Sequence, residues 1–415
     1  MIWGRVVSLV NGAAEPTPPD GAGSSEYVRG IRSVRFTSRV LSINESPRRG
    51  DTVVDLAGAR ILPGLINAHD HLELNHYGRL KFRESYPNAV DWIDDMRRHL
   101  ADTTVREQQR HPLTERLFIG ALKNLLSGVT TVAHHNPRYS ELRRTMPIRV
   151  VRRYGWAHSF AMEHGPAGAR GEPGGEVAQR WRRTSADVPF FVHLAEGIDT
   201  AAAAELTRLD ELGCLGPNTL AVHGVAIDAA GFQRMVETNA GLVWCPASNV
   251  FLFGRTANVR HLLDASNGTP PAVALGSDSR LTGANDMLDE LRAAHATRLA
   301  SADELFDMVT VNAARMLRVR HAGRLIVGQP ADLIVIPNTA PDEAASVLAA
   351  RRRDVSLVVV GGRPLIGTPG LAQLFHARGV NTRQIEVDGA ARLADSGLVR
   401  RIEGCPIAEP GVTWS

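Results

Sequence analysis

Hydrophobic and polar residues follow two different periods along the chain, and the change between them divides the sequence into parts. Up to about residue 60, the β-branched runs RVVSLV, VRFTSRVLSI and TVVDLAGARI predict strands, with the turn-rich segment NGAAEPTPPDGAGSSE between the first two. From Leu62 onward, short apolar runs alternate with longer stretches of helical period. After about residue 321, GRLIVGQPADLIVIP and VSLVVVGGRPLIG return to strand patterning.

Helical period is strongest in six stretches of the middle part. These stretches are residues 91–101, 114–128, 201–213, 228–240, 285–300 and 301–319. We expect Asn285 to cap the fifth helix. The sixth should begin with a capping box, because Ser301 is followed three residues later by Glu304.

Between the helices lie the apolar runs LPGLINAH, VTTVAHH, FFVHLAE, TLAVHG, GLVWCP and AVALGSD. Alternating strands and helices predict βα units around a parallel sheet. We therefore expect an α/β fold, a (β/α)8 TIM-like barrel with a small β-sandwich domain formed by both chain ends. The expected domains are residues 1–60 and 321–415 for the β domain and tail, and 61–320 for the barrel. Residues 147–165 must supply the third and fourth strands in little space.

The stretch NAHDHL carries the first candidate chemistry. Residues two apart on a strand point to the same side, so His69 and His71 can face one ion while Asp70 points away and forms a structural hydrogen bond. Neutral imidazole is the commonest metal ligand. Two histidines at this spacing, taken without further ligands, are nevertheless more typical of histidines hydrogen-bonded in a turn.

Three later strand ends present further ligand-type residues. FFVHLAEG places His193 and Glu196, LAVHG places His223, and LGSDS places Asp278. Each has an ordinary structural alternative: a core histidine, a solvated glutamate or a helix-capping aspartate. The C-terminal strand ends of a parallel barrel form its active site, so ligand-type residues at four strand ends in order predict a metal site.

The motifs LPGLINAHDHL, GVTTV, VHLAEG, AVHG, CPASN, LGSDS and AGRLIVGQPADLIVI together resemble the amidohydrolase superfamily. The likeness is greatest to its branch of cytosine, guanine and S-adenosylhomocysteine deaminases and triazine hydrolases. It spans roughly residues 1–365. The resemblance implies one divalent metal ion, zinc first and iron as the alternative. The metal ligands that it implies are His69, His71, His193 and Asp278.

The same resemblance assigns catalytic roles. It makes Glu196 the proton shuttle and places His223 against the metal-bound water or the substrate. Binuclear branches bridge two metals with a carboxylated lysine at the end of the fourth strand. The only lysines of this chain, Lys81 and Lys123, precede the second strand, so a mononuclear centre is implied.

A divalent metal lowers the pKa of its bound water to about 7, which supplies hydroxide at neutral pH. Asp278 would accept the proton of the water as hydroxide attacks an sp² carbon, and Glu196 would protonate the adjacent ring nitrogen. His223 would hydrogen-bond the developing oxygen centre. Two carboxylates in different environments can divide the base and acid tasks. The expected reaction is deamination of an amino-substituted N-heterocycle, a hydrolysis of a non-peptide C–N bond that releases ammonia.

Two alternatives remain. The first keeps the metal-hydroxide chemistry but opens a cyclic amide or ureide, or displaces chloride or an alkylamine from a triazine-like ring. The second, from a different class, is a non-catalytic metal-binding scaffold. That scaffold predicts loss of Glu196, Asp278 or a ligand, and none is lost.

Substrate contacts are expected near the strand ends. The candidates are Glu73, His76, His135 and His158. Glu73 could pair with an amino edge of the substrate or face solvent. The apolar run VFLF after Asn249 predicts a flat wall for an aromatic or heterocyclic ligand, and Asn249 itself is expected to order its loop. Cys245 is expected to pack, because a metal-hydroxide mechanism needs no thiol nucleophile.

Composition limits the other function classes. The net charge is +3, and the arginines are interspersed with acids, so the clustered basic face of a nucleic-acid binder is not predicted. No apolar run approaches the roughly 18–20 residues that span a membrane. Three cysteines without metal-finger or CxxC spacing suit a reducing compartment.

We therefore expect a cytoplasmic enzyme with a small-molecule substrate and with neither nucleic-acid nor membrane partners. A homo-oligomer formed through the barrel helices is an expectation by analogy. The tail from about residue 372 to 415 lies outside the resemblance and is expected to extend the β domain or to reach a second subunit.

Overall fold

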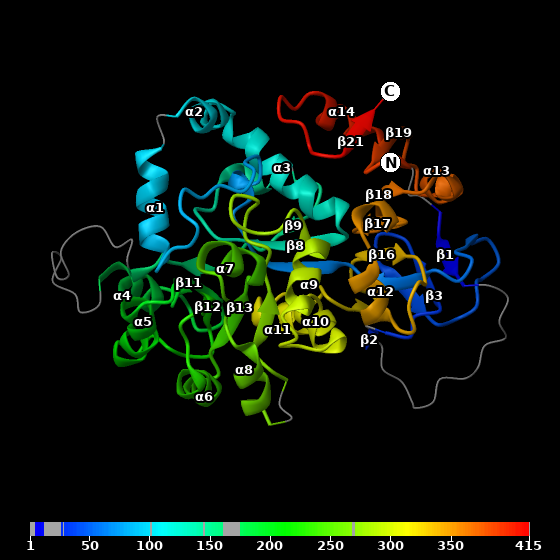
Figure 1. Ribbon diagram of the computed structural model, residues 1–415. Helices are drawn as coiled ribbons and strands as arrows, with labels where there is room; N and C mark the ends of the chain where they lie inside the picture. The colour runs from blue at the N-terminus through cyan, green and yellow to red at the C-terminus, as the bar shows by residue number, and fades with distance from the viewer. Residues whose placement is uncertain are drawn as a thin grey trace.

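The computed structural model describes residues 5–11, 26–27, 29–99, 102–143, 146–160, 175–267 and 270–414 (Figure 1). Within these ranges the chain has an α/β fold, with strands and helices alternating through its middle part. Elements from the two chain ends, coloured blue and orange to red, lie together at one side of the molecule in Figure 1. The turn-rich segment predicted near the N-terminus falls almost entirely outside the described residues.

The middle of the described chain contains two groups of parallel strands. The first is β7 (Leu65–Asp70), β8 (Val129–His134) and β9 (Arg149–Val150). The second is β10 (Gly155–Trp156), β11 (Phe190–Leu194), β12 (Thr219–His223), β13 (Gly241–Trp244) and β14 (Val273–Leu275). Most of their residues are buried, as expected for a parallel sheet that is covered on both faces.

Backbone hydrogen bonds also join the end of this series to its beginning. The N–H of Asp278, just beyond β14, donates to the carbonyl of His69 in β7 at 3.1 Å. β9 and β10 are the shortest strands of the series, with residues 151–154 between them, and both fall in the segment predicted to have little space. That segment continues to residue 165, of which residues 161–165 lie outside the described chain.

Helices cover the parallel strands, and α13 and α14 lie instead against strands of the two outer sheets described below. Their bounds are α1 (Ala89–Arg98), α2 (Thr103–Gln109), α3 (Leu113–Leu126), α4 (Gly175–Arg182), α5 (Thr200–Glu211), α6 (Ala229–Thr238), α7 (Pro246–Phe253), α8 (Val259–Ala265), α9 (Met287–Ala296), α10 (Ala302–Met308), α11 (Val311–Met316), α12 (Glu343–Ala349), α13 (Ala372–Ala377) and α14 (Ser396–Glu403). Short 3-10 turns occur at η1 (Leu72–Leu74), η2 (Ser140–Arg143), η4 (Arg352–Asp354) and η5 (Pro369–Leu371).

The predicted caps are partly right. The capping box at Ser301 and Glu304 is present, with reciprocal hydrogen bonds of 3.2 and 2.7 Å. Asn285 is wrong as the cap of α9, because the Asp286 carboxylate accepts the N–H groups of Leu288 and Asp289. A carboxylate also interacts more favourably than an amide with the positive N-terminal end of the helix dipole.

The last predicted helix is divided into α10 and α11. The break lies at Val309 and Thr310, two β-branched residues with reduced helix propensity. The predicted apolar wall VFLF is part of helix α7. This helix begins at Pro246, since proline is well suited to the first turn of a helix.

Strands from both chain ends form two larger sheets. The first has the order β4 (Val40–Ile43), β3 (Ser33–Phe36), β1 (Val7–Val10), β5 (Thr52–Asp55). The second has the order β21 (Val412–Trp414), β19 (Thr382–Val387), β20 (Ala390–Asp395), β18 (Arg363–Gly367), β17 (Leu357–Val360), β16 (Leu333–Ile336), β6 (Arg60–Pro63). β2 (Glu26–Tyr27) pairs with β15 (Leu325–Ile326).

These two sheets share one apolar core, although their residues come from opposite ends of the chain. The core includes Val7, Val34 and Val54 from the first sheet and Ile61, Leu333 and Val359 from the second. Neither sheet could bury these side chains without the other, so the two chain ends are held together by hydrophobic burial.

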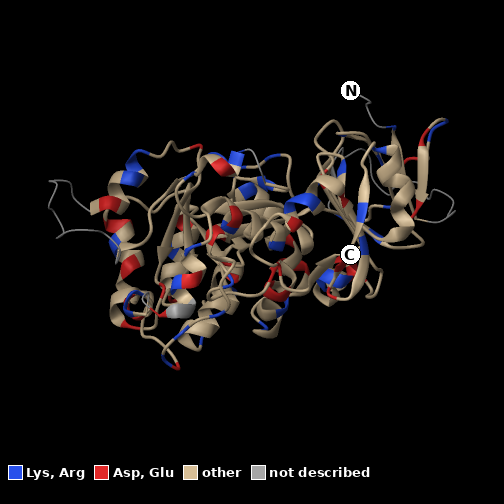
Figure 2. Cartoon of the chain, turned by 90° about the horizontal axis from the view of Figure 1, so that it is seen from above, with Lys and Arg blue, Asp and Glu red and all other residues tan. Residues whose placement is uncertain are grey.

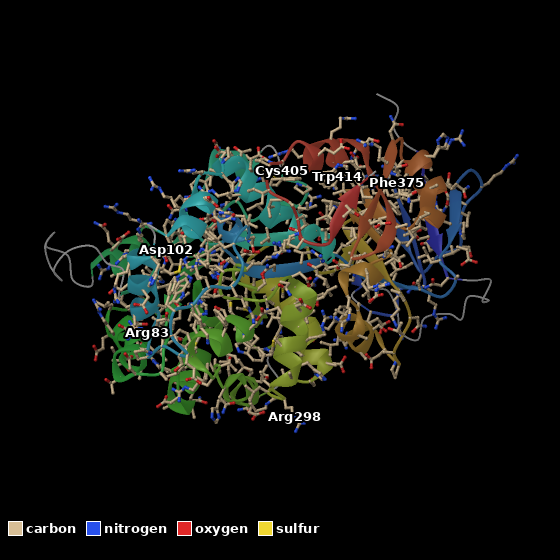
Figure 3. All side chains as sticks on the ribbon, turned by 45° about the horizontal axis from the view of Figure 1, so that its top comes forward. Arg83, Asp102, Arg298, Phe375, Cys405 and Trp414 are labelled. Carbon is tan, nitrogen blue, oxygen red and sulfur yellow. The ribbon has the colours of Figure 1, made fainter. Side chains whose placement is uncertain are left out.

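The C-terminal tail extends the seven-stranded sheet. β19 and β20 form an antiparallel pair, and β21 pairs with β19 on its other side. Figure 3 labels Phe375 on α13, Cys405 after α14 and Trp414 on β21, all along the upper part of that view. Within the described residues, the tail therefore continues the seven-stranded sheet.

Basic and acidic side chains are mixed over the surface. In Figure 2, blue and red segments are interspersed over the cartoon. Many of them pair on the same or neighbouring helices, for example Arg234 with Asp210 and Glu237. Across the described chain, no helix combines the length and the apolar character that crossing a membrane requires.

A close helix contact near the strand ends gives a first prediction. A Cβ added to Gly120 of α3 would lie 2.3 Å from the carbonyl oxygen of Leu72, so Gly120→Ala must push α3 away from η1. We expect the free energy of unfolding to fall by about 1–3 kcal/mol, measured by urea denaturation. Gly370→Ala is the matched control, because nothing lies within 4 Å of its added Cβ. Equal stability of the two variants would contradict this packing argument.

Candidate metal centre and active site

Three histidines from two strands converge at one end of the parallel series. His69 lies in β7, His71 follows that strand, and His193 lies in β11. The rings of His69 and His71 are 4.9 Å apart, and the Nε2 atoms of His71 and His193 are 3.3 Å apart. All three side chains are buried. The structure thus brings together the three histidines that the sequence motifs single out as metal ligands.

A fourth histidine joins this group. His135 follows β8, and its ring stacks on His193 with centroids 4.2 Å apart. One ligand atom from each of His69, His71, His135 and His193 can be chosen so that all lie within 4.8 Å of one another. The Nε2–H of His135 donates to the carbonyl of Ala157 at 3.0 Å, which leaves its Nδ1 as an unpartnered acceptor. The sequence predicts His135 as a substrate contact, whereas the structure places it in this four-histidine group.

The hydrogen bonds of this group are incomplete without a cation. His69 is fully buried and neither ring nitrogen has a partner, so every tautomer leaves a donor and an acceptor unsatisfied. The Nδ1–H of His193 donates to the carbonyl of His158 at 3.0 Å, so its Nε2 is an acceptor directed at His71. Burial and the neighbouring histidines lower the pKa of His69 and His193 well below 6.5, so neither ring holds an extra proton at neutral pH. Buried neutral imidazoles with free acceptor nitrogens fit a divalent metal ion.

Asp278 adds a carboxylate beside the histidines. Its Oδ1 lies 3.8 Å from Nε2 of His69, while Oδ2 accepts hydrogen bonds from the hydroxyls of Ser248 and Thr282 at 2.9 and 2.8 Å. Burial opposes ionisation of Asp278. The facing histidines, the Thr282 hydroxyl and the Ser279 N–H nevertheless keep the pKa of Asp278 below its usual value. A charged, firmly held carboxylate therefore faces the group.

Glu196 and His223 form a second pair within the site. The Nδ1–H of His223 donates to Oδ1 of Asn249 at 2.9 Å, which directs its Nε2 to Glu196 Oε1, 3.5 Å away. Burial raises the pKa of Glu196, and the neighbouring His223 offsets this only in part. Asn249, expected to order a loop, also fixes the tautomer of a site histidine.

The strand ends themselves are conformationally strained. Ala195, His223 and Asp278 adopt the left-handed backbone region, with φ of 53°, 75° and 52°. This region is unfavourable for residues with a Cβ, so such residues persist where the surroundings hold them, commonly at functional sites. All three lie at or just beyond the ends of strands β11, β12 and β14, where the turn directs the side chains of His223 and Asp278 inward.

These groups open onto a cavity of about 180 Å³. Its polar lining consists of His71, Asn136, His158, His193, Glu196, His223, Asp278, Ser279 and Thr282. Its apolar lining consists of Leu74, Ala89, Trp92, Ile93, Leu252 and Leu281. Of the predicted substrate contacts, His158 lines the cavity, and burial lowers its pKa to about 4.

Glu73 and His76 lie elsewhere than expected. Glu73 is buried, its Oε1 accepts a short hydrogen bond from Asn136, and its Oε2 lies 3.7 Å from His134. The Nε2–H of His76 donates to the carbonyl of Gln108 at 3.1 Å. Neither side chain is among the described residues that line the cavity. Their position in the sequence close to His71 does not indicate this, because the chain turns at η1 directly after His71.

Lys123 is a supporting residue that sequence reasoning missed. It is completely buried on α3, and its Nζ donates to Asn75 Oδ1, Ser277 Oγ and the Asp278 carbonyl at 2.7–3.1 Å. Asp70 lies 3.1 Å from the same Nζ. A buried lysine on an otherwise apolar helix face was the available signal. Asp70 does form the expected structural hydrogen bonds, although it is fully buried.

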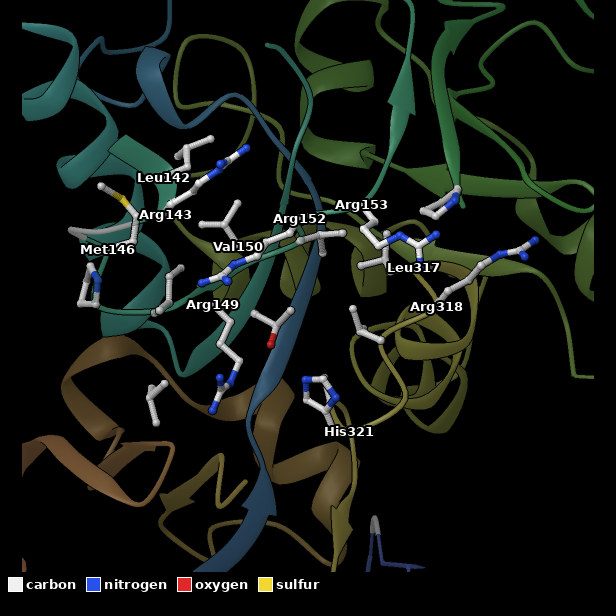
Figure 4. Close-up of a pocket in the computed structure, with 18 of the residues that line it drawn as sticks. Leu142, Arg143, Met146, Arg149, Val150, Arg152, Arg153, Leu317, Arg318 and His321 are labelled. Carbon is white, nitrogen blue, oxygen red and sulfur yellow. The ribbon is translucent and has the colours of Figure 1, made fainter. Parts of the chain in front are cut away.

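A larger cavity of about 590 Å³ lies near the N-terminal ends of the parallel strands (Figure 4). Arginines dominate its polar lining, namely Arg143, Arg149, Arg152, Arg153 and Arg318, together with His321. None of the four clustered histidines lines it. Size alone therefore does not identify the reactive site, which lies where the titratable groups converge.

Comparisons with known proteins agree with this geometry. Residues 184–365 match the model of the amidohydrolase family. A 5-methylthioadenosine/S-adenosylhomocysteine deaminase of Natronomonas pharaonis is 25% identical over 386 residues, covering 80% of this chain and 86% of the relative. A 5′-deoxyadenosine deaminase of Methanothermobacter thermautotrophicus is 24% identical over 377 residues, covering 77% and 85%.

Solved structures share the fold. A triazine hydrolase from Arthrobacter aurescens superimposes with a TM-score of 0.66 at 18% identity, covering 90% of this chain and 99% of that chain. An adenosine deaminase from Xanthomonas campestris with bound zinc has a TM-score of 0.62 at 17% identity, covering 90% and 97%. Together with the family match, these findings confirm the resemblance to the amidohydrolase superfamily and the expectation of a metal-dependent hydrolase.

The backbone of the strand end next to Glu196 is fixed by a second glutamate. Glu205 on α5 accepts the N–H of Ala195 at 2.7 Å, and burial raises the pKa of Glu205 to about 7. Its ordinary value is 4.5, so folding favours the protonated form. The stabilisation of the fold by protonated Glu205 is complete below about pH 4.5 and is lost as the pH rises through about 7.

We therefore expect Glu205→Gln to flatten the fall in unfolding free energy between about pH 4.5 and pH 7, by up to roughly 1.4 kcal/mol per pH unit. The measurement is urea denaturation across this range, with wild type and variant compared at each pH so that histidine titration cancels. Glu211→Gln, an exposed position at the end of the same helix, is the control and should keep the wild-type slope. Identical slopes for wild type and Glu205→Gln would contradict the assignment.

Proposed function

We propose that this chain is a mononuclear metal-dependent aminohydrolase that converts an amino-substituted N-heterocycle to its oxo form and releases ammonia. The observation that carries this proposal is His69, fully buried with both ring nitrogens unpartnered, at the centre of the four-histidine group. A proton cannot satisfy the acceptor nitrogens of His69, His71 and His193 together, whereas one coordinated cation can. The deaminase relatives support the reaction class.

The fold proposal follows from strand order. The two groups of parallel strands, joined by the Asp278–His69 backbone hydrogen bond, support a (β/α)8 barrel formed by residues 61–320. The shared core of the two outer sheets supports a β-sandwich domain formed by residues 1–60 and 321–415. In such a barrel the site lies at the C-terminal strand ends, where the histidines are found.

We assign the metal to His69, His71, His193 and Asp278, with zinc first and iron as the alternative. Three imidazoles and a carboxylate suit either ion. His135 supports the set by stacking on His193, and its free Nδ1 makes it the candidate for an exchangeable ligand. Lys123 is held in hydrogen bonds beneath the site, and so it is not available as a bridge between two metals.

A divalent ion at this position supplies a Lewis acid and a water of lowered pKa. Asp278, which stays ionised, is placed to accept the proton of the attacking water. Glu196, whose pKa is raised by burial, is suited to take up a proton and to give it to a ring nitrogen in the cavity. His223, with its tautomer fixed by Asn249, orients the Glu196 carboxyl and the oxygen of the product.

The cavity favours a compact planar substrate. Its volume of about 180 Å³ is below the roughly 300–1,000 Å³ of sites for drug-sized ligands. Trp92, Leu252 and Leu281 give it apolar walls, and the carboxyls lie with the histidines. This arrangement supports an aminated heterocyclic ring, of the kind found in the adenosine-type substrates that the relatives are named for.

Metal analysis tests the centre. We expect purified, metal-replete protein to contain about one divalent ion per chain, by elemental analysis, as one set of four ligands requires. His71→Ala should lose most of this metal, whereas the exposed His261→Ala on α8 should retain it. Two equivalents per chain would contradict the mononuclear assignment.

An ammonia-release screen tests the reaction. Aminated purines, pyrimidines, pterins and triazines are incubated with the metal-replete enzyme, and we expect ammonia from at least one class. Glu196→Gln should keep its metal but lower kcat by about 100- to 10,000-fold, because it lacks the proton to donate. Glu211→Gln, an exposed site on α5, is the matched control and should retain activity. Release of chloride, or of a new carboxylate without ammonia, would favour the ring-opening or triazine alternative.

A further inference from the structure

The loop that follows β14 faces two ways. Asp278, Ser279, Leu281 and Thr282 line the cavity of the proposed active site. Arg280, between them in sequence, directs its guanidinium away from the cavity, and only 8% of its side chain is exposed. A buried cation two residues from the Asp278 carboxylate needs a buried partner of opposite charge.

That partner is Glu409, near the C-terminus. Its carboxylate accepts both terminal nitrogens of Arg280, with Nη1 to Oε2 at 2.8 Å and Nη2 to Oε1 at 2.6 Å. The Glu409 side chain is completely buried. Two parallel charge-assisted hydrogen bonds fix orientation as well as distance. The tail thus holds the loop in one defined geometry.

Arg352 attaches the same carboxylate to the β sheets. Its Nη1 donates to Glu409 Oε1 at 2.6 Å, and its Nη2 donates to Asp388 Oδ1 and to the carbonyl of Pro410 at 2.6 and 2.7 Å. Asp388 in turn donates its backbone N–H to Gly411 at 2.7 Å. β21 begins directly after Gly411 and pairs with β19 in the seven-stranded sheet. This sheet gives Glu409 a rigid support.

Arg280 also connects to the histidine pair. Its Nε donates to the carbonyl of Asn285, which closes the loop, and its backbone N–H donates to Asn75 Oδ1 at 3.1 Å. The Asn75 amide donates to Asp70 and to the carbonyl of His71 at 2.7 and 3.1 Å. Glu409 is therefore connected to the backbone of His71 through two residues, Arg280 and Asn75.

We propose that the C-terminal segment 404–411 is a positioning element of the active site, in which Glu409 holds Arg280 and, through it, the loop that presents Asp278. The segment lies outside the family match of residues 184–365. Glu409 is a positioning residue, because it touches none of the lining groups of the cavity except through Arg280. The proposal rests on the proposed function for the role of Asp278, and its test does not require a substrate.

The experiment compares Glu409→Gln with Glu403→Gln, an exposed glutamate on the same tail that pairs with Arg383. Two quantities are measured: amide hydrogen exchange of the peptide covering residues 276–286 in the metal-free protein, and the dissociation constant of Co²⁺ read from its absorption spectrum. In Glu409→Gln we expect faster exchange confined to this loop and a Co²⁺ affinity weaker by about 10- to 100-fold, the usual effect of losing a partner behind the ligands. Glu403→Gln should match wild type in both.

Glu409→Gln leaves Arg280 and Arg352 with an excess buried charge, so a second variant guards against simple unfolding. Arg280→Gln/Glu409→Gln removes both partners, while Arg352 keeps Asp388. It should fold, exchange its loop faster and bind Co²⁺ more weakly, as the single variant does. Wild-type loop exchange and wild-type Co²⁺ affinity in this double variant would overturn the proposal and leave the tail a structural element only. Failure of the proposed function would be seen separately, as absence of ammonia release by wild type with the Co²⁺ and exchange effects intact.

Discussion

The structure of this site depends on one constraint: several imidazoles are buried together without enough hydrogen-bond partners. Burial lowers the pKa of His69, His135 and His193 well below 6.5, so the cluster cannot be filled with protons at neutral pH. Buried polar atoms without partners are costly, so the cluster is stable only if something accepts their lone pairs. A cation bound by these histidines would meet that need, and it would also account for the ionised carboxylate of Asp278 at the edge of the cluster.

The supporting layer behind the cluster follows from the same need for fixed geometry. Asp70, between the paired histidines, accepts hydrogen bonds from Asn75 and Asn124 and forms an ion pair with the buried Lys123. A buried ion pair adds little stability compared with apolar packing, but removing one partner is expensive, so such a pair specifies position. Lys123 also holds the Asp278 carbonyl, and thereby links the first and last strand ends. Glu409 and Arg280 hold the same loop from its other side.

Periodicity and motif order predicted the larger part of this arrangement. Strand geometry placed His69 and His71 on one side, and ligand-type residues at later strand ends predicted that His193 and Asp278 would join them. What the sequence could not supply was the identity of partners distant along the chain. Three residues have no sequence pattern that names their partners. In the fold, Lys123 lies beside Asp70, Asn249 beside His223 and Arg280 beside Glu409. Predictions of helix ends were wrong where neighbouring residues favour different boundaries. Examples are the cap of α9, where Asp286 takes the place predicted for Asn285, and the break between α10 and α11 at Thr310.

Glu73 and His76 show why sequence proximity to a ligand is a weak guide to substrate contact. The chain leaves β7 through η1, against which α3 packs so closely that Gly120 has no room for a Cβ. That turn carries Glu73 away from the cavity toward Asn136 and His134, and carries His76 toward Gln108. The apolar wall of the cavity is instead built by segments far apart in sequence, α1 with Trp92, α7 with Leu252 and the loop with Leu281. In the proposed enzyme, substrate specificity therefore depends on how these three segments pack over the four-histidine group, and a change in any one of them alters the cavity without altering a proposed metal ligand.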